Sequence, residues 1–208
     1  MDRDRMHLLL RRLHSLAGIL PIGAYLLAHI FLENSFVLGG PKRFNLLVET
    51  IAQIPTAVLL GTEILVLWAP IIFHGVYGLV ILRSADIPNA LHYDYTNSYL
   101  YVLQRVTGVI AFFFIGFHVY TTRLAYYFHG TEITYDFMHS YMSNPVWFAV
   151  YVVGVMSAIF HFTNGIWTFC VTWGITIGAA AQRMVQLASV ALFVVMSFTG
   201  MAILVAFR

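Results

Sequence analysis

Charged residues and cysteine are both scarce in this chain. Asp, Glu, Lys and Arg make up only 10% of its 208 residues, whereas 60% are hydrophobic and the mean hydropathy is +0.81. A soluble domain of this length cannot hide so large an apolar fraction from water. The single cysteine, Cys170, permits neither an internal disulfide nor a thiolate cluster. These absences predict an integral membrane protein in which Cys170 is a small packing residue.

Long polar segments are lacking as well. Five apolar stretches are each long enough, at 1.5 Å rise per residue, to cross the bilayer core as a helix. The expected spans are approximately 13–38, 56–82, 100–127, 146–173 and 184–207. The basic N-terminal tail and four connections that remain are too short for a soluble catalytic domain. We therefore expect one all-α transmembrane domain over 1–208, with its chemistry between helices or on a partner protein.

Lysine and arginine are distributed unevenly between the two sides of such a bundle. One side holds Arg3, Arg5, Arg11, Arg12, Arg83, Arg105 and Arg183, and the other holds Lys42, Arg43, Arg123 and Arg208. Because basic residues near helix ends resist translocation, the richer side is predicted to be cytoplasmic. The N-terminus is then cytoplasmic, the C-terminus lies on the outer side, and 83–98 forms a polar cytoplasmic loop.

Four histidines occupy the first four apolar stretches, one in each. They are His29, His74, His118 and His161. In the expected threading, His29 and His118 lie towards the outer face and the other two towards the inner face, with the levels about 10–15 Å apart. An ionisable side chain at such depth is costly and usually functional. Four isolated packing residues or proton relays explain this arrangement less well than two paired sites.

Each pair of histidines is expected to hold a haem. No Asp, Glu or Cys joins either pair, which argues against zinc, whereas a haem needs only two opposed imidazoles and an apolar slot. Two axial ligands leave iron no open position and so favour electron transfer. Gly18 and Gly108, about three turns before His29 and His118, would open the slot at the inner level. Simple helix packing is the alternative role for these glycines.

Polar residues near the inner helix ends could contact the anionic haem propionates. The candidates are Arg12, His14, Ser15, Gln104, Arg105 and Thr172. For the arginines, anchoring at the membrane surface is an equal alternative.

Three residues are candidates for a quinone or proton site at the outer level. Glu63 lies eleven residues before His74 on the same helix face, so it either carries protons or stays protonated and bonds a neighbour. Glu49 and Gln53 lie in the outer connection before the second span. The remaining histidines considered, His7, His92, His129 and His139, fall in tails or loops and are expected to be solvated or interfacial.

Several short strings resemble one known family. They are RRLHSLAG at 11–18, FHGVYG at 73–78, LQRVTG at 103–108, FHV at 117–119, IFHFTNGIW at 159–167 and VTWGIT at 171–176. They closely resemble the cytochrome b subunit of five-helix, two-haem succinate:quinone oxidoreductases, the succinate dehydrogenase and fumarate reductase family. The resemblance extends essentially from end to end.

The resemblance implies a membrane anchor with four helices around two stacked haems B. His74 and His161 would ligate the haem nearer an iron–sulfur subunit, and His29 and His118 the distal haem. His14 would contact the inner propionates together with Ser15. A flavoprotein bound to the iron–sulfur subunit would oxidise succinate, so this chain would be the quinone-reactive subunit and would not act on succinate by itself.

The expected surroundings are the lipid of a bacterial cytoplasmic membrane and a quinone, with menaquinone favoured and no nucleic acid. Two alternatives stay open. The same subunit could serve a quinol:fumarate reductase, in which electrons run the other way. A different class is a non-redox membrane scaffold or proton-conducting bundle whose histidines bind no metal.

Overall fold

The computed structural model describes residues 3–92 and 95–208. Within these ranges, five helical segments are long and apolar enough to cross a membrane. In chain order these first to fifth spans are Asp4–Gly39, Thr56–Arg83, Thr96–His129, Pro145–Thr172 and Ala179–Ala206. The all-helical class and the five expected spans are confirmed, and the chain is a multi-pass membrane protein.

The first three spans each contain π-helical turns, whereas the last two are unbroken. The first comprises α1 (Arg3–Ala17), η1 (Gly18–Gly23), α2 (Ala24–Ala28), η2 (His29–Glu33) and η3 (Asn34–Gly39). The second comprises α4 (Thr56–Glu63), η4 (Ile64–Trp68) and α5 (Ala69–Arg83). The third comprises α7 (Thr96–Val119), η5 (Tyr120–Leu124) and α8 (Ala125–His129), and the others are α10 (Pro145–Thr172) and α11 (Ala179–Ala206). Of these pieces η1, η2, η4 and η5 are π-helical, a form that is frequent at functional sites.

The first helix begins earlier than expected. The apolar stretch starts near residue 13, but α1 already begins at Arg3. Residues 3–12 precede the apolar stretch and carry four arginines and an aspartate, yet leucine, methionine and arginine favour helix, so the helix of the first span already begins there. Leu8 is 57% exposed on this extension, which therefore offers an apolar side chain among basic ones.

The connections contain three further helices, which the expectation of short loops omitted. They are α3 (Pro41–Ala52), α6 (Ile87–His92) and α9 (Tyr135–Ser143), and residues 93–94 of the expected polar loop lie outside the described residues. The α9 helix covers the end of α11: Tyr135 donates to the Ala206 carbonyl at 3.2 Å and His139 Nδ1–H to the Phe207 carbonyl at 2.9 Å. These bonds satisfy carbonyl groups that a helix end leaves unpaired. His139, expected to be solvated or interfacial, is therefore half-buried and bonded at the end of the bundle.

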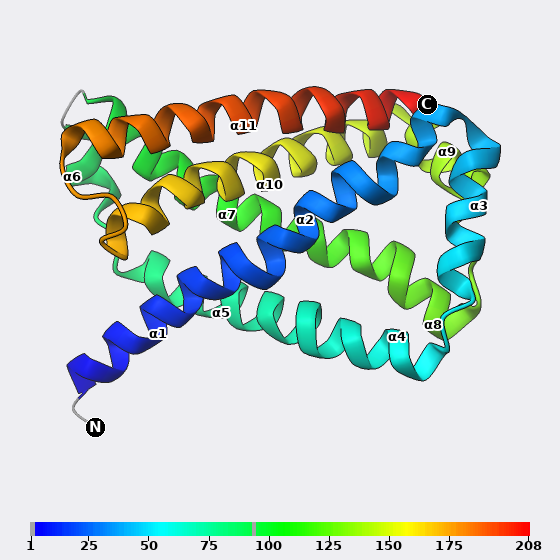
Figure 1. Ribbon diagram of the computed structural model, residues 1–208, viewed down its shortest axis with the longest axis horizontal. Coiled ribbons are helices and arrows are strands. Elements are labelled where there is room, and N and C mark those ends of the chain that lie inside the picture. The colour runs from blue at the N-terminus through cyan, green and yellow to red at the C-terminus, as the bar shows by residue number, and fades with distance from the viewer. Residues whose placement is uncertain (1–2, 93–94) are drawn as a thin grey trace.

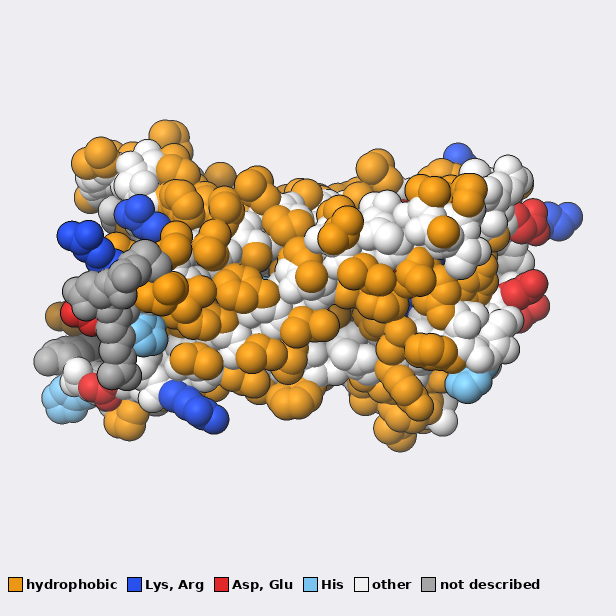
Figure 2. Space-filling model, turned by 90° about the horizontal axis from the view of Figure 1, so that it is seen from below, with side chains coloured by type: hydrophobic (Ala, Val, Ile, Leu, Met, Phe, Trp, Pro, Cys, Tyr) orange, Lys and Arg blue, Asp and Glu red, His pale blue; other side chains and the backbone are white. Residues whose placement is uncertain are grey.

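The five spans extend from one end of the molecule to the other, and the first of them crosses it obliquely (Figure 1). The N-terminus and α6 lie at one end, here called the inner end, and the C-terminus, α3 and α9 lie at the other, the outer end. The α10 helix packs against α7, α11 and the inner part of the first span, and it buries Tyr151, Ile159 and Phe162. Figure 2 shows apolar side chains over the middle of the molecule and charged ones gathered at its two ends. This distribution suits a bundle that crosses a bilayer.

Candidate functional site

His74 on α5 and His161 on α10 face each other in the inner half of the bundle. Their ring centroids are 6.0 Å apart and their planes are inclined by 84°. The Nδ1–H of His74 donates to the main-chain carbonyl of His14 at 2.7 Å, and that of His161 to the carbonyl of Gln104 at 2.9 Å. Because a carbonyl can only accept, this network assigns the proton to Nδ1 and leaves a lone pair on Nε2 of both rings.

His29 and His118 form a second pair with the same separation. Their ring centroids are 6.0 Å apart, with planes inclined by 69°. The Nδ1–H of His29 donates to Glu33 Oε2 at 2.7 Å, and the Tyr25 hydroxyl lies 3.1 Å from the same nitrogen. His118 Nδ1 lies 3.3 Å from the hydroxyl of Tyr151, whose oxygen can accept a hydrogen bond from Nδ1–H. Both rings thus have a partner at Nδ1 that leaves Nε2 for another ligand.

The separation of the rings in both pairs fits a metal held between two imidazoles. With metal–nitrogen distances of about 2 Å, and ring centroids about 1 Å behind the nitrogens, two opposed imidazoles have centroids about 6 Å apart. Metal-binding histidines almost always donate their other N–H to a carbonyl or carboxylate, as three of these four do. Within the described residues, no group of three or more His, Cys, Asp or Glu side chains is placed to hold a metal ion. The residues therefore fit a haem with two axial histidines and do not fit a zinc site.

Gly18 and Gly108 make room for the inner pair. A Cβ atom at Gly18 would lie 2.9 Å from His74 Nδ1, and one at Gly108 would lie 2.9 Å from His161 Nδ1, closer than Cβ atoms approach other groups. The helical spacing predicts both glycines at the inner level, and the structure has them there. The space they leave is taken by the imidazole rings themselves.

Among the buried polar atoms at the inner end that have no partner in the described structure are His14 Nδ1 and Arg105 Nε. The ring of His14 stacks on His74, with centroids 3.9 Å apart and planes inclined by 9°. Arg105 donates from Nη1 to the Tyr101 carbonyl at 2.9 Å and lies over the Tyr101 ring. The unpaired Nε–H of Arg105, together with His14 Nδ1 in its protonated tautomer, suits an anionic group such as a propionate.

Gln104 is bonded to two residues of the fourth span, His161 and Asn164. Its side-chain Nε2 donates to the His161 carbonyl at 3.0 Å, and its Oε1 accepts from Asn164 Nδ2 at 2.6 Å. The main-chain carbonyl of Gln104 also accepts the hydrogen bond from His161 Nδ1–H. Gln104 therefore connects the third span to the fourth at His161. A contact of Gln104 with a haem propionate stays a prediction.

Ser15 connects the first span to the end of α10. Trp173 Nε1–H donates to Ser15 Oγ at 3.0 Å, and that hydroxyl donates to the Arg12 carbonyl at 2.9 Å. The Arg12 guanidinium lies 5.6 Å from the centroid of the Trp173 ring. Thr172, the remaining propionate candidate, is exposed at the end of α10.

Glu63 forms an ion pair between the second and third spans. Its Oε1 lies 2.7 Å from both Nε and Nη2 of Arg123, and its Oε2 accepts from the Tyr127 hydroxyl at 3.2 Å. The Glu63 side chain is only 13% exposed. Of the two roles considered, the structure shows the bond to a neighbour, and its role in proton transfer stays a prediction. Glu49 and Gln53 are exposed at the outer end of the molecule.

A hollow of about 370 Å³ lies beside the outer pair. It is lined by Phe117, Thr121, Ser140, Tyr141, Asn144 and Trp147. Phe117 and Thr121 flank His118 on the third span, and the Phe117 ring stacks on Trp147 with centroids 5.1 Å apart. Aromatic surface next to hydroxyl and amide groups suits a flat ring with polar substituents.

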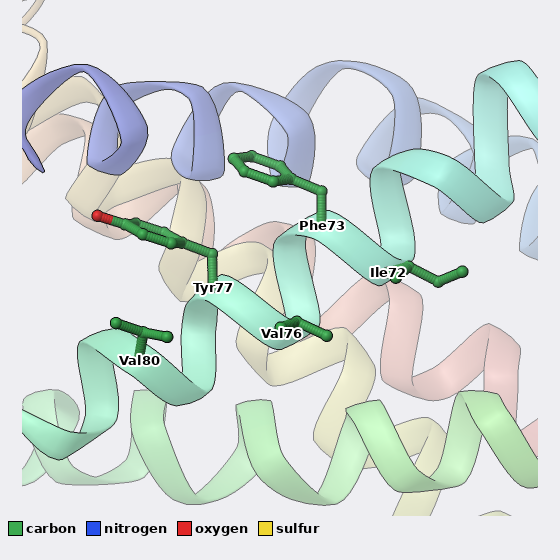
Figure 3. Close-up of a pocket in the computed structure, with 5 residues that line it drawn as sticks. All are labelled: Ile72, Phe73, Val76, Tyr77 and Val80. Carbon is green, nitrogen blue, oxygen red and sulfur yellow. The ribbon is translucent and has the colours of Figure 1, made fainter. Parts of the chain in front are cut away.

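A second hollow, of about 250 Å³, lies on α5 (Figure 3). Its lining consists of Ile72, Phe73, Val76, Tyr77 and Val80. Because all five side chains come from one helix, the hollow is a groove on a helix surface, unlike a ligand cavity with converging polar groups.

Four side chains around the histidine pairs were not predicted. They are Tyr25, Glu33, Tyr151 and Asn164. The first two lie four residues before and after His29, a helical spacing that could have revealed them. The other two come from the fourth span, and their contacts depend on how α7 packs against α10, which no local pattern specifies.

Fold and site together define a five-span helical membrane protein with two facing pairs of histidines. Residues 88–201 match the family described as "Succinate dehydrogenase/Fumarate reductase transmembrane subunit". The chain is also 41% identical over 197 residues to the succinate dehydrogenase cytochrome b558 subunit of Bacillus subtilis (strain 168), which covers 95% of each protein. The chain belongs to the succinate dehydrogenase/fumarate reductase transmembrane subunit family.

Proposed function

We propose that this chain is the dihaem cytochrome b anchor of a succinate dehydrogenase and conducts electrons from an iron–sulfur subunit to a membrane quinone. The observation that carries this proposal is the pair of matched histidine sites. In each site the rings face each other at 6.0 Å and have a partner at Nδ1. The likeness to the Bacillus subtilis subunit supports the assignment to succinate oxidation.

His74 and His161 would hold one haem B, and His29 and His118 a second. Bound there, the two haems would supply reversible one-electron centres inside the membrane. The chain's own residues fix the orientation of the imidazoles and keep their Nε2 lone pairs available. At the inner level, His14 and Arg105 have donors free for propionates, and Arg12, Ser15, Gln104 and Thr172 are proposed as the further polar boundary of this site.

The inner end is proposed to face the cytoplasm and to bind the iron–sulfur subunit, which binds a flavoprotein in turn. The exposed extension of α1 carries Leu8 and Leu9 beside Arg11 and Arg12. A surface of apolar and basic side chains at this end suits a protein partner better than lipid tails. The chain itself would not act on succinate, and the membrane would be the bacterial cytoplasmic one.

The quinone, with menaquinone favoured, is proposed to bind at the outer level. Two places are available there, on opposite faces of the third span: the hollow at Thr121 and Ser140, and the ion pair of Glu63 with Arg123. The hollow has the aromatic walls that a quinone ring needs. T121V/S140A is expected to raise the KM for quinone about tenfold, while E63Q leaves it within about twofold. The reverse result would assign the site to the ion pair, with Glu49 and Gln53 as its outer neighbours.

A quinol:fumarate reductase is the second candidate function, since the family description names both enzymes. The residues that hold the cofactors would be the same, and the direction depends on the partner subunits and the quinone potential. Comparing succinate oxidation with fumarate reduction in the assembled complex separates the two.

A visible difference spectrum of the purified complex, reduced minus oxidised, tests the proposal itself. Two haems B per chain with absorption bands of six-coordinate b-type haem are expected. Absence of a b-type signal would contradict the cytochrome function and favour a metal-free scaffold or proton-conducting bundle.

A further inference from the structure

The inner and outer histidine pairs differ in what their Nδ1 atoms contact. At the inner pair, both partners are main-chain carbonyl groups, of His14 and Gln104, which carry no net charge. At the outer pair, the partner of His29 is the carboxylate of Glu33 at 2.7 Å. The ring centroids are 6.0 Å apart in both pairs. The two sites therefore have the same spacing but differ in the charge of the group that accepts the Nδ1–H hydrogen bond.

We propose that Glu33 is a positioning residue that sets the reduction potential of the outer haem through His29, without affecting the inner haem. This inference rests on the proposed function, because it requires a haem at each level. A carboxylate that accepts the Nδ1–H draws the proton towards itself and gives the imidazole partial anionic character. The ring then donates more electron density to iron and favours the ferric state, which lowers the potential.

The local backbone holds the carboxylate in place. His29 and Glu33 are the first and last residues of the π-helical turn η2, and the next residue, Asn34, donates from Nδ2 to the His29 carbonyl at 2.9 Å. On the other side of the ring, Tyr25 stacks on His29 with centroids 5.2 Å apart. The imidazole of His29 therefore contacts a residue one helical turn before it, Tyr25, and a residue one turn after it, Glu33. These contacts fix the orientation of the ring.

Solvent moderates the effect but does not remove it. The Glu33 side chain is 34% exposed and that of His29 30% exposed, so water reduces the long-range field of the charge. The direct hydrogen bond at 2.7 Å is screened less than a charge acting from a distance. The expected influence is accordingly local, on the iron bound to His29.

Redox titration of the purified complex, followed by visible spectroscopy, tests the inference in the E33Q variant. The amide keeps a hydrogen-bond acceptor of the same length and removes the charge. The reduction equilibrium of the outer haem is expected to shift about tenfold towards the ferrous form, which is a rise of 59 mV for one electron. The potential of the inner haem is expected to stay the same.

E132Q is the matched control, since Glu132 is an exposed carboxylate in the connection between α8 and α9 at the outer end. It should leave both potentials unchanged. Equal shifts of both haems, no shift in E33Q, or the same shift in E132Q would each overturn the inference. If E33Q loses the outer haem, E33D takes its place. Its shorter side chain withdraws the carboxylate from the 2.7 Å contact with His29, so a smaller rise in the potential of the outer haem alone is expected, and an unchanged potential would overturn the inference. Absence of two haems in the unmodified complex would instead contradict the proposed function.

Discussion

His74 donates its Nδ1–H to the main-chain carbonyl of His14 at 2.7 Å, while its ring stacks on the imidazole of the same residue at 3.9 Å. A residue of the first span thus orients a proposed iron ligand of the second. The carbonyl survives any substitution at position 14, the stacking survives only replacement by another aromatic ring, and the buried Nδ1 is lost in either case. The two contributions can therefore be separated by mutation.

H14A is expected to bind the inner haem more weakly, and H14F to recover part of the loss. Stacking of two rings contributes about 0.5–1.5 kcal/mol, which phenylalanine can restore, whereas the buried Nδ1 donor is lost in both variants. Haem content and the thermal midpoint of the purified complex measure the difference. An H14A protein with unchanged inner haem content and midpoint would show that neither contact matters.

G108A is expected to reduce occupancy of the inner haem, because its Cβ would meet His161 at 2.7 Å from Cε1. Gly116 lies on the same helix with no neighbour within 4 Å of a Cβ atom, so G116A is the matched control. Alanine is favoured over glycine in a helix by about 1 kcal/mol, so any loss in G108A is steric. The haem-to-protein ratio provides the measurement. Equal ratios in the two variants would contradict the close packing at Gly108.

Removing one partner of the Glu63–Arg123 ion pair is expected to destabilise the contact between the second and third spans. E63Q and R123Q should each lower stability by about 1–3 kcal/mol, because the other group is left partly buried and uncompensated. The double variant E63Q/R123Q should lose less than the sum of the two. Thermal unfolding of the three proteins gives the coupling, and strict additivity would show that the pair is not coupled.

The orientation in the membrane can be tested by cysteine labelling. Since Cys170 is the only cysteine, a C170S chain accepts a single new one at Asn89 of α6 or Lys42 of α3. Asn89→Cys is expected to react with an impermeant maleimide only after the cytoplasmic side is opened, and Lys42→Cys in intact cells. The opposite pattern would invert the proposed orientation.

Much of the architecture could be predicted because a segment that crosses a membrane must be long and almost entirely apolar, which is visible in the sequence. The five spans and the inner level of Gly18 and Gly108 follow from apolar length and from 3.6-residue periodicity. The extension of α1 and the helices α3, α6 and α9 could not be predicted in this way. They lie outside the bilayer core, where hydropathy no longer distinguishes a helix from a loop.

The residues that form hydrogen bonds with Nδ1 of the paired histidines were less predictable than the histidines themselves. Gln104 orients His161 through its main-chain carbonyl, which accepts the hydrogen bond from His161 Nδ1–H. Every residue has such a carbonyl, so no sequence pattern could indicate this contact. The partner of Glu63 was visible in the sequence only as one basic residue near a helix end. Identifying this partner as Arg123 requires knowing which faces of the second and third spans meet, and this is determined by tertiary packing.

Haem stoichiometry in the four single His→Ala variants tests the central claim most directly. H29A and H118A are expected to lose the same haem, and H74A and H161A to lose the other, because the facing rings are His29 with His118 and His74 with His161. Each variant should retain one haem per chain, identified by its spectrum and potential. Loss of the same haem in H29A and H74A, or retention of both haems in any variant, would contradict the pairing.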